Sequence, residues 1–439
     1  MLTEKQHKRR NGFVDPDTWR MSIMHGPHGS RDSLERHHAK IRRKHEFEDA
    51  FNQFYPLKDG LKEPIQITFV DQFDTVEAGI DGGGVTKEFL TSVTSQAFGP
   101  TDGLKMFIEN DQHLLYPNPA AVEEQKEMLR QIGIKEGSPI WREEVTNLLQ
   151  RYEFLGMVAG KCLYEGILVD INFAGFFLLK WALTGGTGSA PNESGYRANL
   201  NDLRDMDEEL YQGLLKLKNY PGDVEDWGLN FTITDTITTD FRRGTTKTIT
   251  RELKPGGVDI PVTNENRLVY ISYVARYRLQ VQPFQQTAAF LRGLSSIIQP
   301  SWLSMFNQSE LQSLISGTSS SISVPDLRRN TLYGGVYQLG EPPVEHPTIQ
   351  IFWRVMENMT EDEKKAVLKF VTSTPRAPLL GFASLNPRFS IRDAGADQER
   401  LPSTSTCVNL LKLPMYKDEK TLREKLLYSV FSGAGFDLS

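Results

Sequence analysis

Residues 401–414 read LPSTSTCVNLLKLP. A polar stretch rich in serine and threonine leads into Cys407, and mainly apolar residues follow it. Serine and threonine favour loops, whereas a short apolar run favours a buried strand. The pattern predicts that Cys407 lies where a polar loop meets a strand, with its thiol near the surface. Such a thiol is a candidate nucleophile, provided that it is partly ionised.

The second cysteine, Cys162, has a different setting. It lies within a helical, largely apolar block, where a free cysteine behaves as a small buried hydrophobe. A cysteine hydrolase needs a histidine base that a third group holds in place. Six of the eight histidines fall in residues 1–45, and only His113 and His346 lie beyond. Cys407 is therefore better suited to exchanging one thioester for another than to activating water, because positioning supplies most of the acceleration in such an exchange.

Metal and nucleotide sites are not indicated. No cysteine pair has zinc spacing, and no His-Glu-x-x-His helix occurs. The glycine runs at residues 82–84 and 185–188 fit neither the dinucleotide nor the P-loop spacing. We expect them to allow tight turns. The sequence predicts no metal and no cofactor.

Composition indicates a globular protein with several cores. The 439 residues carry a net charge of −6, which argues against broad nucleic-acid binding. Residues 1–45 are an exception, with 11 Lys and Arg against 5 Asp and Glu. We interpret this head as a solvated helix against an acidic body; a nucleic-acid or targeting arm is the alternative. The most apolar stretch, residues 166–183, carries charges that a membrane span would exclude. Two cysteines and no signal peptide favour a reducing compartment, the cytoplasm or nucleus.

Composition also divides the chain. A basic, partly helical lead-in covers residues 1–62. Mainly helical segments follow, interrupted by a more polar stretch over residues 200–262. Residues 317–323 are rich in glycine and serine; composition alone allows a flexible linker or an ordinary surface loop. The remaining residues, 324–439, have the pattern of a compact domain that contains Cys407.

Several separated motifs, in order, resemble the HECT-type ubiquitin ligases over roughly residues 63–439. They are the glycine turn GIDGGGVTKEF at residues 79–89, FLG at 154–156 through FFLLK at 176–180, TNENR at 263–267, FW at 352–353, RAPLLGF at 376–382, the Cys407 loop at 401–414 and Gly435-Phe436 near the end. One such motif is weakly specific, but this ordered set is highly specific.

The resemblance implies an α+β, bilobal fold. A mainly helical N-lobe would cover residues 63–317, with a small conjugating-enzyme-binding subdomain at 185–262. Residues 318–323 would form the hinge, and an α/β C-lobe would cover 324–439. The implied enzyme is a ubiquitin-protein transferase that accepts ubiquitin from a conjugating enzyme as a thioester on Cys407 and passes it to a lysine of a substrate or of ubiquitin. The hinge would let the C-lobe move between donor and acceptor.

The resemblance also carries over site residues. Large apolar side chains suited to anchoring a conjugating enzyme are Leu210, Leu214, Tyr220, Trp227, Leu229 and Tyr270, although local core is the alternative for Leu229. Near the nucleophile, Thr406 and Arg376 would shape the loop. Phe436 and Asp437, with the terminal carboxylate, would orient or deprotonate the incoming lysine. Ser405 stands where the family often has histidine, so no proton-transfer role is assigned there.

Two other functions remain open at this stage. The chain could be a non-catalytic scaffold that binds ubiquitin or a conjugating enzyme, or a hydrolase of ubiquitin chains. Its serine-containing loop and its ending resemble the fungal and animal branch linked to proteasomes, which adds the proteasome to the expected partners of ubiquitin, conjugating enzyme and protein substrates. Family members usually carry long amino-terminal regions, so we expect this chain to be part of a longer protein.

Overall fold

The protein combines many helices with small sheets. The computed structural model describes residues 38–71, 75, 84–99, 104–184, 195–241, 243–318, 321–340 and 344–432. Its strands form three two-stranded sheets and one four-stranded sheet, and helices separate them in the chain. The predicted α+β class is confirmed.

Contacts between backbone segments divide the chain into two compact units. The first contains Met1–Thr94, Lys161–Ile171 and Gln312–Ser439, and the second contains Ser95–Gly160 and Asn172–Leu311. The first unit thus joins an early part of the chain to its carboxyl-terminal part. The predicted lobe and hinge boundaries stay a prediction; within the hinge, residues 319–320 lie outside the described part.

The first unit begins with a small parallel sheet, β1 (His38–Arg42) paired with β2 (Gln66–Val70). Helix α4 (Glu46–Phe54) and the 3-10 segment η1 (Tyr55–Lys62) connect these strands. Helix α5 (Gly84–Phe98) starts in this unit, and Phe89 packs edge-on against Phe54 of α4 at 5.4 Å between ring centroids. The amino-terminal part of α5 is thereby fixed to the strand–helix segment that precedes it.

The carboxyl-terminal part of this unit has its own core. Its elements are α13 (Gln308–Ser316, which begins in the second unit), α14 (Val324–Arg329), β7 (Leu332–Gly334), α15 (Pro347–Glu357), α16 (Glu361–Thr372), β8 (Ser390–Asp393), β9 (Ser403–Ser405), η8 (Thr406–Val408), β10 (Leu410–Leu413) and α17 (Glu419–Ser432). The sheet order is β7-β8-β10-β9. Buried side chains from Ile322 to Leu426 form one cluster around Phe352 and Trp353. The alternation in β10 buries Leu411 and Leu413 in that cluster.

The second unit is built on crossing helices and aromatic packing. Its elements are β3 (Phe107–Glu109), β4 (Leu115–Pro117), α6 (Ala121–Gln131), α7 (Pro139–Glu165, which continues into the first unit), α8 (Gly175–Ala182), η2 (Leu200–Asp205), α9 (Glu208–Asn219), η3 (Val224–Trp227), β5 (Thr232–Asp240), β6 (Thr245–Glu252), η4 (Gly257–Asp259), α10 (Arg267–Arg276), η5 (Tyr277–Val281), α11 (Phe284–Ile297) and α12 (Pro300–Leu303). A Cβ on Gly156 would lie 1.9 Å from the Phe290 carbonyl oxygen, and one on Gly293 would lie 1.7 Å from that of Glu153. Glycine at both positions lets α7 and α11 cross in close contact.

Several expected elements are present with revised limits. Apolar residues near helical spacing predict one helical block over residues 142–184, but the structure interrupts it: α7 ends at Glu165, Gly166 has φ 71°, and α8 starts at Gly175. Apolar residues at helical spacing predict a helix over Glu46–Phe54 that ends before Pro56, and this is confirmed: α4 ends at Phe54, and Pro56 lies in the first turn of the separate 3-10 segment η1. Thr360 and Glu363 have the spacing that predicts a capping box, and the structure confirms it at the start of α16.

Candidate active site

Cys407 lies in a tight turn at the tip of a hairpin. Strands β9 and β10 run antiparallel with Ser405 opposite Leu410, and η8 between them contains the cysteine. Asn409 follows this turn with φ 51°, in a left-handed conformation that asparagine adopts more readily than most residues. Cys407 itself is half-buried. The strand expected after Cys407 is confirmed as β10, but Ser403–Ser405, which were expected in a loop, form strand β9 because they pair with β10.

The surroundings of Cys407 favour the protonated thiol. Burial raises the pKa of the Cys407 thiol, and the nearby Glu88 carboxylate raises it further. Backbone hydrogen bonds within the turn and the charge of Lys87 lower the pKa, but by less. The thiol is thus mainly protonated at neutral pH, and its reaction partner must take up the proton.

The other groups considered for cysteine chemistry serve structural roles. Cys162 is buried, and burial raises the pKa of its thiol to about 12, which confirms an inert core position. His346 caps α15, with its Nδ1 accepting a hydrogen bond from the Thr348 backbone N–H at 3.2 Å. His113 contacts the Glu109 carboxylate at 3.0 Å. These local contacts argue against either histidine as the base of a cysteine hydrolase.

Lys87 of α5 reaches the Cys407 turn from an early part of the chain. Its Nζ donates to the carbonyl oxygen of Thr372 at 2.7 Å and to that of Thr406 at 3.1 Å. It also donates to the side-chain oxygen of Asn409. The side chain is only 4% exposed. The sequence reasoning missed this residue; its position in the glycine-turn motif was the available signal, but that motif alone does not say what the lysine contacts.

Asn409 links the turn to the rest of the sheet. It is fully buried, and its side-chain nitrogen donates to the Pro387 carbonyl. Its backbone N–H donates to the Thr406 carbonyl at 3.3 Å, and its own carbonyl accepts from Ser390 N–H at 2.9 Å. Thr406 lies just before Cys407, and Asn409 lies two residues after it. These two residues are therefore hydrogen-bonded to each other and to Lys87.

The remaining residues predicted near the nucleophile have different positions. Arg376 donates to the side-chain oxygen of Ser316 at 2.6 Å, beside the bridge between Thr318 and Ala377. Its recorded contact is therefore with the end of α13. Phe436 and Asp437 lie outside the described residues, so their role stays a prediction.

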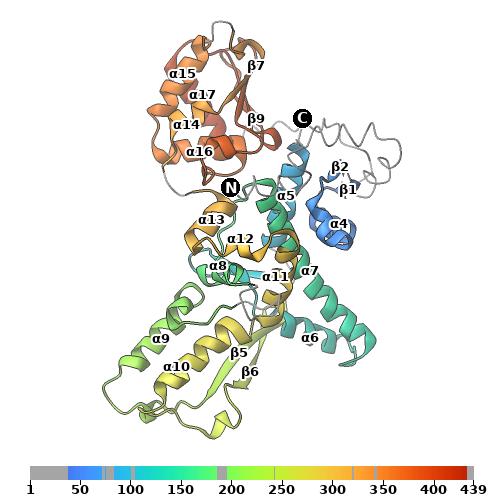
Figure 1. The fold of residues 1–439 in the computed structure, drawn as a ribbon, viewed down its shortest axis with the longest axis vertical. Helices are drawn as coiled ribbons and strands as arrows, with labels where there is room; N and C mark the ends of the chain where they lie inside the picture. The colour runs from blue at the N-terminus through green and yellow to red at the C-terminus, as the bar shows by residue number, and fades with distance from the viewer. Residues whose placement is uncertain are drawn as a thin grey trace. The chain divides into compact units, whose positions relative to one another are not determined.

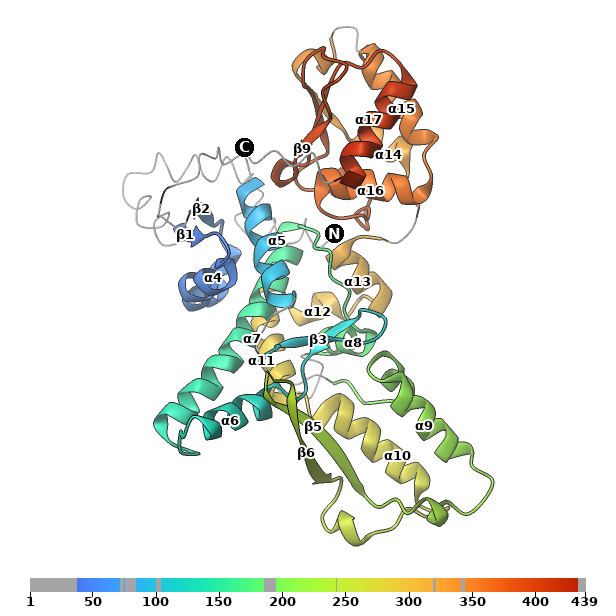
Figure 2. The ribbon, with the colours of Figure 1, turned by 180° about the vertical axis from the view of Figure 1, so that it is seen from behind.

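A groove in the second unit collects most of the predicted conjugating-enzyme residues. It has a volume of about 440 Å³ and is lined by Asp207, Glu209, Leu210, Gly213, Leu214, Leu217, Trp227, Leu229 and Tyr270. The Asp207 side chain caps α9 by accepting from Leu210 N–H at 2.8 Å. Figures 1 and 2 show α9 and α10 side by side. Leu217 is a lining residue that the sequence reasoning missed.

Tyr220 supports this groove from its edge. Its ring packs edge-on against Trp227 at 5.2 Å between centroids, and its carbonyl accepts from the Arg267 guanidinium at 2.7 Å. Trp227 is 39% exposed, whereas Leu214 and Tyr270 are buried. The groove thus presents one large accessible aromatic side chain on an apolar floor. The role of these six residues in binding stays a prediction.

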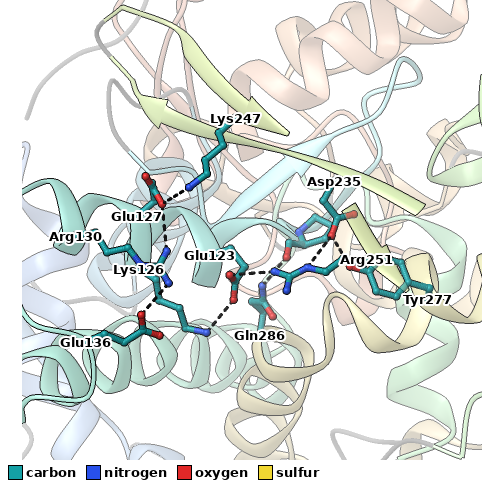
Figure 3. Close-up of polar contacts among 11 residues, drawn as sticks. Glu123, Lys126, Glu127, Arg130, Glu136, Asp235, Lys247, Arg251, Tyr277 and Gln286 are labelled. Atoms are coloured by element: carbon teal, nitrogen blue, oxygen red, sulfur yellow. Dashed lines mark hydrogen bonds and ion pairs between the residues drawn. The ribbon is translucent and has the colours of Figure 1, made fainter. Parts of the chain in front are cut away.

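Ion pairs connect the β5–β6 hairpin to α6 in the same unit (Figure 3). Arg251 lies 3.2 Å from Glu123 and 3.8 Å from the buried Asp235. Asp235 also pairs with Arg278 at 2.8 Å, and Lys247 pairs with Glu127 at 3.3 Å. The hairpin is therefore held to α6 along much of its length.

Among the described residues, no cluster of three or more His, Cys, Asp or Glu side chains is arranged to hold a metal ion. In the same part of the chain, no helix combines the length and apolar character that crossing a membrane requires.

A family model described as HECT-domain (ubiquitin-transferase) matches residues 91–439, including the Cys407 hairpin and the groove. The chain belongs to the HECT family. Its resemblance to that family, first drawn from separated motifs, is therefore confirmed over most of its length. Lys87 lies just before the matched range.

Named relatives agree with this HECT assignment. A probable E3 ubiquitin protein ligase of Schizosaccharomyces pombe is 47% identical over 92% of this chain and 35% of its own length. The E3 ubiquitin-protein ligase HUL5 of Saccharomyces cerevisiae is 41% identical, covering 92% of this chain and 40% of its own length. The human ubiquitin-protein ligase E3B is 37% identical, with 92% and 36% covered.

The HECT chain spans well under half the length of these relatives. The comparisons identify it as a ubiquitin-transferase domain of the kind found in E3 ubiquitin-protein ligases.

Proposed function

We propose that this HECT domain accepts ubiquitin from a conjugating enzyme as a thioester on Cys407 and transfers it to a lysine of a substrate or of ubiquitin. The observation that carries this proposal is the contrast between the two cysteines. Cys407 is half-buried at a hairpin tip, whereas Cys162 is buried in the core. Only a thiol that another protein can approach can exchange a thioester with it.

The proposed chemistry has two steps. In the first, the sulfur of Cys407 attacks the thioester carbonyl at the carboxyl terminus of ubiquitin. A new S–C bond forms, the bond to the conjugating enzyme's sulfur breaks, and that sulfur leaves with the proton that Cys407 gives up. In the second, a neutral lysine amine attacks the new thioester. A C–N bond forms, the Cys407 sulfur leaves, and it takes up the proton that the amine releases.

The raised pKa of the Cys407 thiol is compatible with these two reaction steps. Because the thiol is mainly protonated before reaction, it is protected from unselective electrophiles. Exchange between two thioesters is close to energy-neutral, so the main requirement is that the two sulfurs and the carbonyl be brought together in the right geometry. A docked conjugating enzyme would supply that proximity.

The apolar groove is our proposed docking surface for the conjugating enzyme. Trp227 and Tyr270 line it together with Leu210, Leu214 and Leu229, and Tyr220 supports Trp227. Exposed aromatic side chains on an apolar floor are typical anchors of protein interfaces. Asp207 and Glu209 at its edge add negative charge that would favour a partner with basic residues around its apolar contact.

A thioester assay tests the nucleophile. The protein is mixed with ubiquitin, ATP, activating enzyme and a panel of conjugating enzymes, and the products are separated without reducing agent. We expect a thiol-sensitive ubiquitin adduct that Cys407→Ala abolishes and Cys162→Ala preserves. No adduct with any conjugating enzyme in the panel would instead favour a scaffold, and direct binding to ubiquitin and to conjugating enzymes would then be measured.

The wider assignments belong to this same proposal. Protein substrates, and the proteasome as an eventual partner, follow from the family resemblance. The cytoplasm or nucleus fits a chain with two free thiols, because a reducing compartment keeps such thiols available.

A further inference from the structure

One buried lysine holds both sides of the Cys407 turn. The Lys87 Nζ binds the carbonyl of Thr406, which precedes the cysteine, and the side chain of Asn409, which follows it by two residues. The same nitrogen binds the carbonyl of Thr372. All these residues belong to one compact unit of the fold, although Lys87 comes from α5 and the others come from the carboxyl-terminal part of the chain.

The number of contacts matches the chemistry of an ammonium group. A protonated lysine has three N–H donors and no acceptor, and Lys87 has three oxygen atoms within hydrogen-bonding reach. Its third partner, Thr372, is the last residue of α16. Carbonyl groups at a helix carboxyl end carry partial negative charge, which further favours a cation there. A neutral side chain of the same length would leave these buried acceptors without their donor, which is costly.

The Lys87 ammonium group titrates close to neutral pH. Burial lowers the pKa of Lys87 to about 7 and outweighs the opposing effect of Cys407. Glu88, the adjacent residue on α5, pairs with Arg43 at 2.7 Å. At pH 7 about half of the Lys87 side chains are therefore protonated and able to use all three donors.

We propose that Lys87 is a positioning residue for ubiquitin transfer from Cys407, because its ammonium group fixes both flanks of the turn that carries the sulfur. Lys87 acts through Thr406 and Asn409 and does not touch the reacting atoms. The inference rests on the proposed thioester function and deepens it. We call the three hydrogen bonds of Lys87 to Thr372, Thr406 and Asn409 the Lys87 clamp. The clamp exists only while α5 contacts the carboxyl-terminal part of the chain, so the geometry of Cys407 depends on that contact.

The test measures the second step by itself. Cys407 is loaded with ubiquitin, the conjugating enzyme is removed, and the rate constant for discharge to free lysine is measured per loaded molecule over a range of lysine concentrations. We expect Lys87→Met to lower the maximal discharge rate constant roughly 10- to 100-fold, the scale of a small misplacement of a reacting group. The lysine concentration at half-maximal rate should change little. A purely structural role would lower the yield of loaded protein and leave the rate constant per loaded molecule unchanged.

A matched control separates this effect from general loss of a lysine. Lys369 lies on α16 and pairs with Asp170 at 3.1 Å, but its side chain is 59% exposed. Lys369→Met should discharge at the wild-type rate. An equal fall in both variants would overturn the proposal, as would an unchanged rate in Lys87→Met.

A second variant removes the contact between Lys87 and Asn409 by changing Asn409. It provides a test even if Lys87→Met folds poorly. Asn409→Gly removes the acceptor while tolerating the left-handed backbone. Its effect on the discharge rate should be of similar size, and the double variant Lys87→Met/Asn409→Gly should fall by less than the product of the two single effects, since both act on one contact. Multiplicative effects, or full activity of Asn409→Gly, would contradict a shared clamp. Wild-type protein that never forms a thioester would instead refute the proposed function.

Discussion

The Lys87 ammonium group binds the side-chain oxygen of Asn409, a residue 322 positions later in the chain. This contact joins α5 to the turn that carries Cys407, and it is buried at both ends. A loop that must present a sulfur atom in one geometry gains from such a fixed point, because short turns otherwise sample several conformations.

The reactivity of Cys407 should depend on the charge of Glu88. The Glu88 carboxylate is one of the groups that raise the pKa of the Cys407 thiol, so Glu88→Gln should lower that pKa and increase the thiolate fraction near neutral pH. Alkylation of Cys407 by iodoacetamide should therefore become faster at pH 7, and its pH profile should move to lower pH. Measurements in the Cys162→Ala background isolate the signal. A profile that moves to higher pH or stays fixed would contradict this electrostatic account.

Trp227 should carry a large share of conjugating-enzyme binding. It is the accessible aromatic side chain of the groove, and loss of such an anchor commonly costs about 2 kcal/mol or more. Trp227→Ala should weaken binding roughly 30-fold, measured by calorimetry with a conjugating enzyme that supports loading. Ile132→Ala is the control, because Ile132 is 72% exposed but does not line the groove. Equal affinities of the two variants for the conjugating enzyme would exclude the groove as its docking surface.

Arg278 should stabilise the second unit through Asp235. The Asp235 side chain is only 7% exposed and pairs with Arg278 at 2.8 Å, while Arg251 and Tyr277 supply further contacts. Arg278→Met leaves this buried carboxylate with fewer partners and should lower the free energy of unfolding by about 1–3 kcal/mol in urea titrations.

The corresponding surface change should have little effect. Arg243 is 83% exposed and lies 3.8 Å from Asp240, so Arg243→Met should alter the unfolding free energy by less than about 0.5 kcal/mol. Equal losses in Arg278→Met and Arg243→Met would show that burial of Asp235 does not set the strength of this network.

Removal of residues 436–439 should separate the two chemical steps. The proposed role of Phe436 and Asp437 is to orient or deprotonate the incoming lysine, which is unreactive as an ammonium ion. The shortened protein should load Cys407 normally and discharge to lysine more slowly, by roughly 10-fold or more if a general base is lost. Discharge at the full rate would exclude this role, and failure to load would assign the segment to the first step.

Local patterns predicted the elements around Cys407 well, because each has a strong local cause. Pro347 opens α15, Thr360 and Glu363 form the capping box of α16, and the four-residue spacing of Leu422, Leu426 and Val430 gives α17 its core-facing side. Boundaries set by tertiary contacts were less predictable. Gly166 interrupts the helical block with a positive φ that apolar periodicity does not reveal. The alternating apolar and polar residues 229–234 predict a strand, but β5 starts at Thr232, and Leu229 lines the groove.

In the candidate site, too, features with a local cause were predicted, whereas features that depend on tertiary contacts were not. Cys407 is identified by a local pattern, and the groove residues follow from the family resemblance. Lys87 was not identified, because its three acceptors lie 285 or more positions away. Contacts between residues so far apart in the chain depend on the tertiary packing of α5 against the carboxyl-terminal elements. Local patterns in a single sequence carry little information about that packing.

The most direct test of the account replaces Cys407 by serine. A serine oxygen at this position should accept ubiquitin as an ester, giving an adduct that resists thiols but is cleaved by hydroxide, with mass spectrometry locating the modification on the peptide that contains residue 407. Such an adduct is the result that the account predicts. A thiol-sensitive adduct that persists in Cys407→Ser, or lysine transfer that continues at the wild-type rate in that variant, would contradict Cys407 as the carrier of ubiquitin.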